Sequence, residues 1–143
     1  MPKLDINLTF LTKHKDLGLL ILRLGVGLSY LFLHGWGKIT GGPERWIGLG
    51  KNMPGFGIDA IYMIWGFMAA FAESIGALLF ALGYKYRLMA ALLFITMLVA
   101  TIFHLERGDG FKGASHAMKM MFVFFGLMMM SPGKYSLDEM MKK

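Results

Sequence analysis

The stretch IYMIWGFMAAFAESIGALLFALG, residues 61–83, decides the fold of this chain. It is almost wholly apolar, and at about 1.5 Å per residue a helix of this length crosses the ~30 Å hydrocarbon core of a bilayer. Its single acidic residue, Glu73, lies near the middle. Because an ionisable side chain at that depth is costly, Glu73 is a candidate functional residue.

Three further apolar runs have the length of membrane helices, at residues 17–34, 88–105 and 114–131. Only residues 84–87 separate the run at 61–83 from the one that follows it. So short a connection predicts that these two helices are antiparallel neighbours. The sequence therefore predicts an all-α integral membrane protein, an antiparallel four-helix bundle formed by a single domain over residues 1–143.

The composition indicates the same class and narrows the chemistry. The chain is 56% hydrophobic with 14 Met and 12 Phe, and its mean hydropathy is +0.55, whereas soluble domains are about 45–50% apolar. Cys is 0, which excludes disulfides and redox chemistry on protein thiols. The net charge of +6 comes from clusters between apolar runs, a pattern that favours the headgroups of a lipid bilayer over nucleic acid as partner.

Residues 35–60 form a connection rich in Gly and Pro. Gly35 and Gly37 are expected to end the first helix. Aromatic and basic residues alternate in this connection, among them Trp46 and Arg45, and both types favour the headgroup zone. We expect the connection to lie on the membrane surface or to fold partly back as a lid.

Basic residues are distributed unevenly between the two expected faces. The face with both termini and the 84–87 turn carries Lys3, Lys13, Lys15, Lys85, Arg87, Lys134, Lys142 and Lys143. The opposite face carries Lys38, Arg45, Lys51, Arg107 and Lys112. By the positive-inside rule, both termini are expected in the cytoplasm.

Arg23 is the second charged residue expected inside a span. It lies roughly 9 Å from the cytoplasmic end of its helix, and Glu73 lies roughly 15 Å from that end of its own. An Arg side chain can bridge this difference, so the two residues are expected to form an ion pair that offsets the cost of burying each charge. The pair either fixes helix register or acts as a catalytic proton-handling group beneath a ligand cavity.

Three histidines are expected at one level near the non-cytoplasmic ends of the helices: His34, His104 and His116. Lys38 lies close to the same level. Imidazole can hydrogen-bond a quinone carbonyl or ligate haem, so these four residues are candidates for a cofactor-binding site, for quinone before haem. The alternative is that the histidines have separate roles at the membrane boundary. No metal site is expected.

Four segments follow one another in a recognisable order: LRLG at 22–25 leading to His34 and Lys38, ESIGA at 73–77 leading to Arg87, residues 100–104 ending on His104, and SPGKYSLD at 131–138. In this order and spacing they resemble the DoxX family of small four-helix membrane proteins. The resemblance extends from about residue 17 to residue 138.

The resemblance implies a bacterial or archaeal plasma (inner) membrane and an association with respiratory or redox membrane complexes. Two positions depart from the family pattern. Lys119 stands in the region of the fourth helix where many relatives carry a Glu, and Ser131 replaces the usual Gly. If that Glu takes part in a shared chemistry, Lys119 changes the chemistry in this chain.

Three functions remain open on these grounds. The first is a subunit of a quinone-linked membrane oxidoreductase complex, in which quinone enters from the lipid between helices. The second is a non-catalytic membrane adaptor that recruits a soluble redox enzyme. A soluble or membrane redox partner is among the expected partners of the chain. The third is a small-molecule or ion pathway, which would require a homo-oligomer because four helices enclose little space.

Overall fold

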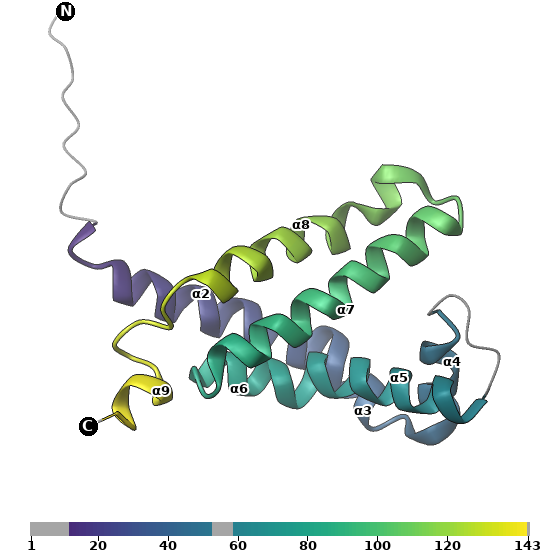
Figure 1. Ribbon diagram of the computed structural model, residues 1–143, viewed down its shortest axis with the longest axis horizontal. Coiled ribbons are helices and arrows are strands. Elements are labelled where there is room, and N and C mark those ends of the chain that lie inside the picture. Colours follow the sequence, from purple (N-terminus) through teal and green to yellow (C-terminus); the bar gives the residue numbers. More distant parts are fainter. Residues whose placement is uncertain (1–11, 53–58, 143) are drawn as a thin grey trace, which may run out of the picture.

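The computed structural model describes residues 12–52 and 59–142, and every regular element in these ranges is a helix (Figure 1). The first long helix consists of α2 (Lys15–Ser29), the π-helical turn η1 (Tyr30–Gly35) and α3 (Trp36–Ile39). The second consists of α5 (Asp59–Phe71), the π-helical turn η2 (Ala72–Gly76) and α6 (Ala77–Leu82). The others are α4 (Gly42–Gly50), α7 (Tyr86–Glu106), α8 (Gly110–Met129) and α9 (Leu137–Met140).

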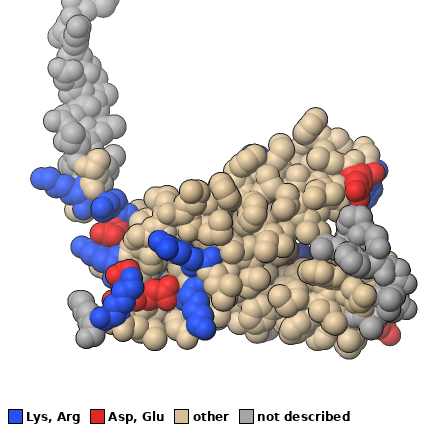
Figure 2. Space-filling view, in the orientation of Figure 1, with Lys and Arg blue, Asp and Glu red and all other residues tan. Residues whose placement is uncertain are grey.

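Three helices within the described ranges are long and apolar enough to cross a membrane: Lys15–Ile39, Ile61–Leu82 and Tyr86–Glu106. Large apolar side chains are exposed along all three, which soluble proteins rarely tolerate. Charged side chains gather at the end where α2 begins and α9 lies, with a smaller group at the other end and an uncharged band between them (Figure 2). The chain is therefore a multi-pass membrane protein. We call the end with α9 the terminal end and the other the loop end.

The α8 helix is long enough to be a fourth span but is not among the three apolar ones. Its 20 residues correspond to about 30 Å, and they include Lys112, His116 and Lys119. It runs back along α7 as a hairpin (Figure 1) and buries Phe124 completely against the other helices. The all-α class is confirmed, whereas the four-span bundle stays a prediction.

The expectation that Gly35 and Gly37 end the first helix is wrong, because this helix continues to Ile39. Gly35 instead lets the two π-helical turns touch. A Cβ atom at Gly35 would overlap the Glu73 carbonyl oxygen and lie 2.6 Å from Ser74 Cα. Glycine costs a helix about 1 kcal/mol, but in lipid small residues allow the close backbone approach that helix packing needs.

Of the two expectations for the 35–60 connection, the structure shows folding back, because α4 packs along α5 (Figure 1); a role as a lid stays a prediction. Trp46 joins α4 to both long helices. Its Nε1 donates a hydrogen bond to the Lys38 carbonyl oxygen at 2.9 Å, and its ring packs edge-on against Phe67 with centroids 5.0 Å apart. Residues 53–58 of the connection lie outside the described residues.

The turn between α6 and α7 is held by hydrogen bonds from both sides. Gly83, at φ 70°, ends α6, and the amides of Gly83 and Tyr84 donate to the carbonyls of Phe80 and Leu79, the bonding of a Schellman motif. The Asp138 carboxylate, from the start of α9, accepts the amides of Lys85 and Tyr86 at 2.8 and 2.9 Å. The chain after α8 thus completes the terminal end.

We expect Gly35→Ala to destabilise the protein by about 2 kcal/mol, because an added methyl group there overpacks the contact between η1 and η2. Gly37→Ala is the matched control, since a Cβ at Gly37 meets nothing within 4 Å. Thermal unfolding in one detergent, followed by circular dichroism, compares the two. Equal stability of both variants would contradict the close contact.

Candidate functional site

Glu73 and Lys38 form a partly buried ion pair beside the contact of the two π-helical turns. Glu73 lies on η2 with its side chain 4% exposed, and Lys38 lies on α3 with its side chain 22% exposed. The Lys38 Nζ donates to Glu73 Oε2 at 2.5 Å. Lys38 reaches Glu73 because the first long helix continues past Gly35 without a break. π-helical turns inside α-helices occur frequently at functional sites.

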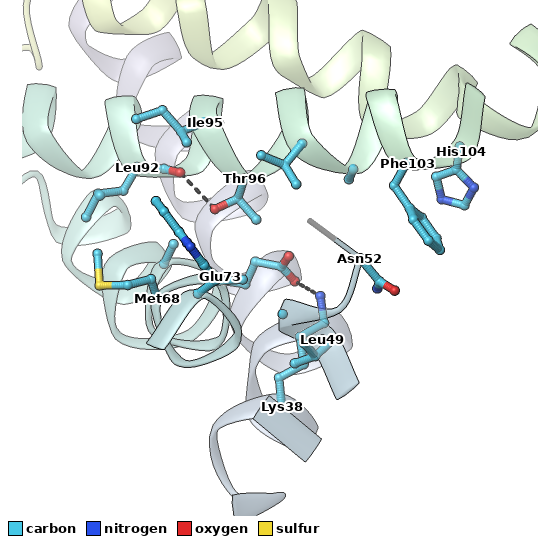
Figure 3. Close-up of a pocket in the computed structure, with 16 residues that line it drawn as sticks. Lys38, Leu49, Asn52, Met68, Glu73, Leu92, Ile95, Thr96, Phe103 and His104 are labelled. Atoms are coloured by element: carbon cyan, nitrogen blue, oxygen red, sulfur yellow. Dashed lines mark hydrogen bonds and ion pairs between the residues drawn. The ribbon is translucent and has the colours of Figure 1, made fainter. Parts of the chain in front are cut away.

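A cavity of about 320 Å³ lies above this ion pair, between the second long helix and α7 (Figure 3). Figure 3 shows the Glu73 carboxylate and the Lys38 ammonium facing each other at the same side of the cavity. Its apolar walls include Leu49, Trp65, Met68, Leu92, Ile95 and Phe103. A concave, mostly apolar space of about 300 Å³ or more with a few polar groups is the usual form of a small-molecule site.

His104 lines the same cavity from the last turn of α7. Its Nδ1 lies 2.7 Å from Asp109 Oδ2, and its side chain is 36% exposed. Asp109 also faces Arg107, whose Nε lies 3.4 Å from Asp109 Oδ1. The cavity therefore has the Lys38–Glu73 pair at one side and an imidazole held by a carboxylate near the loop end.

His34 and His116 lie together in a different place. They line a groove between the first long helix and α8, with ring centroids 5.6 Å apart. The Tyr30 ring lies 5.3 Å from that of His34, and its hydroxyl donates to Met97 Sδ at 3.1 Å. Of the two alternatives for the histidines, one shared site is not seen, because His104 lines the cavity whereas His34 and His116 line this groove. A common depth does not fix the direction in which each helix points its side chain. Cofactor binding by any of them stays a prediction.

The predicted ion pair between Arg23 and Glu73 is also wrong, although both side chains are buried as expected. Arg23 donates from Nη2 to the Tyr135 carbonyl oxygen at 2.9 Å and packs against Gly83 at the end of α6. Arg23 lies at the depth of the segment after α8, near the terminal end of the helices. Glu73 lies closer to the loop end, at the depth of Lys38. Arg23 is thus part of the terminal end and lies apart from the cavity.

Three polar residues of this region, Asn52, Thr96 and Asp109, were not predicted from the sequence. Thr96 lines the cavity, with its hydroxyl donating to the Leu92 carbonyl oxygen at 2.9 Å. Asp109 follows His104 by five residues in a Gly-containing loop, and that spacing was the available signal for a contact across the turn. Within the described ranges, no group of three or more His, Cys, Asp or Glu residues could hold a metal ion.

The comparison with protein families matches the part of the chain that forms the cavity and the ion pair. The DoxX family model matches residues 18–105, which include the ion pair, the cavity walls on α7 and His104. The chain belongs to the DoxX family. The matched part ends before α8, so the similarity of the Ser131–Asp138 segment to the C-terminal segment of DoxX proteins is still a resemblance only. No curated protein and no solved structure matches the chain.

Breaking the ion pair from one side is expected to cost stability. Glu73→Gln and Lys38→Met should each destabilise the protein by about 2 kcal/mol, because each leaves a charge or a polar group buried without its partner. The double variant should lose clearly less than the sum of the two. Thermal unfolding of the four proteins gives this double-mutant cycle.

The exposed pair between Lys142 and Glu139, at 2.7 Å, is the matched control for this cycle. Exposed pairs contribute little, so Lys142→Met should leave the unfolding temperature nearly unchanged. If the Lys38 and Glu73 effects on the free energy of unfolding are strictly additive, the contact between the two side chains contributes nothing to stability, and the prediction is wrong.

Proposed function

We propose that this DoxX-family membrane protein binds a quinone in the Lys38–Glu73 cavity as a subunit of a quinone-linked membrane oxidoreductase complex. The observation that carries the proposal is an ion pair with a buried carboxylate at the side of an apolar cavity in the membrane-spanning part of the chain. A quinone has the matching shape, an apolar ring and tail with two carbonyl oxygens. When bound, it would supply two-electron, two-proton carrier chemistry.

The residues of the cavity fit the two forms of such a ligand. The Lys38 ammonium has three N–H donors. One donates to Glu73, and the others could reach a quinone carbonyl. The Glu73 carboxylate could accept from the hydroxyl of a quinol. His104 faces the cavity from α7 and could contact the second oxygen of the ring. The apolar walls would hold the ring and exclude water.

The proposal includes a placement in the membrane. With α8 as a fourth span antiparallel to α7, both termini lie on one side, where the basic residues of the terminal end meet the cytoplasmic surface. The cavity then lies toward the non-cytoplasmic side of a bacterial or archaeal plasma membrane. A separate redox partner protein would supply the electrons.

Quinone binding is the direct test. Protein in lipid nanodiscs should bind decylubiquinone or a menaquinone analogue, and Glu73→Gln or Lys38→Met should weaken that binding about tenfold or more, since a hydrogen bond to a charged group contributes about 1.5–3 kcal/mol. Tryptophan fluorescence quenching and mass spectrometry of co-purified lipid measure the binding.

His116→Gln is the matched control for this test, because His116 lines the other groove and not the cavity. It should bind quinone as the unaltered protein does. Absence of quinone binding would overturn the proposal, and so would binding that is unaffected by Glu73 and Lys38 but lost in His116→Gln.

A further inference from the structure

Asp109 and His104 form a pair that faces the cavity on one side and the loop between α7 and α8 on the other. His104 is a cavity wall. Asp109 lies in the connection just before α8, at 27% side-chain exposure. The pair therefore joins the interior of the cavity to the surface at the loop end.

The contact orients the imidazole. Asp109 Oδ2 lies 2.7 Å from His104 Nδ1, so the carboxylate accepts the Nδ1 proton and leaves Nε2 for a second partner. The Asp109 amide also donates to the His104 carbonyl oxygen at 3.1 Å, which fixes the loop independently of the side chains. A carboxylate behind an imidazole stabilises the protonated ring, the arrangement that proton-transferring histidines use.

Other charged groups lie on both sides of this pair. Arg107 approaches Asp109 Oδ1 from the loop, and its guanidinium also lies over the Phe103 ring at 5.9 Å. Within the cavity the ionisable groups that share the space with His104 are Lys38 and Glu73. A cavity of about 320 Å³ has room for water or for a ligand head group between them.

We propose that His104, positioned by Asp109, exchanges protons between Glu73 and the aqueous phase at the loop end. His104 takes a proton from water at the loop and passes one into the cavity, where the Glu73 carboxylate receives it; the reverse order releases a proton. No electron moves in this step, and His104 returns to its neutral form. The inference rests on the proposed function in one respect: the protons are those that a bound quinone takes up or releases.

The test follows Glu73 itself in protein without quinone, so its result does not depend on quinone binding. A rapid drop from about pH 8 to about pH 3, a range that includes the ordinary pKa of both His and Glu, is applied to nanodiscs while time-resolved infrared spectroscopy records the carboxyl band. Glu73→Gln identifies the band by its loss. His104→Gln and Asp109→Asn should slow its appearance about tenfold or more, as expected when a proton-transfer group is lost.

Two controls distinguish the relay from a structural effect. Added imidazole should restore the rate in His104→Gln, which a merely structural role would not allow. His116→Gln should leave the rate unchanged, because His116 lines the groove between the first long helix and α8 and not the cavity.

Three outcomes would overturn the proposal. They are unchanged rates in His104→Gln and Asp109→Asn, a slowing in His116→Gln equal to theirs, and no Glu73 carboxyl band at either pH. If quinone binds but the rates are unchanged, the proposed function stands without the relay; if the relay is found but no quinone binds, the cavity serves another ligand.

Discussion

A charge inside the hydrocarbon core must be neutralised by the protein, because no water is there to do it. The Lys38–Glu73 pair meets this constraint, and much of the fold follows from it. The first helix has to continue beyond Gly35 to bring Lys38 to the right depth, and the two π-helical turns have to touch. The cavity is the space that remains on the other side of this pair, against α7.

The sequence predicts the class and the helices well because both are local properties of the chain. Apolar runs gave helix ranges within a few residues of α7 (Tyr86–Glu106) and of the Ile61–Leu82 span. The inward direction of Arg23 and Glu73 was also predictable, since lipid penalises either charge on the outside. Their partners were not, because a partner is set by tertiary packing: Arg23 meets a carbonyl of the segment after α8.

The candidate site was predicted only in part, and Gly35 shows why. A glycine near the end of an apolar run can end a helix or permit a close helix contact, and sequence alone does not separate the two. If Gly35 is taken as the helix end, Lys38 falls outside the helix, and its pairing with Glu73 cannot be predicted. The histidines show a second limit: depth along a helix follows from residue number, but the side on which His104, His34 and His116 fall depends on how the helices are rotated in the bundle.

The contact between Arg23 and Tyr135 joins residues that are 112 positions apart, and this separation has a consequence for how the protein is made. Arg23 enters the membrane in the first helix, whereas its acceptor is still to be synthesised. At about 5–20 residues per second, the guanidinium has to wait several seconds or more near the lipid headgroups or the insertion machinery. The contact of Arg23 with the segment after α8 can therefore form only once α8 and Tyr135 have been made.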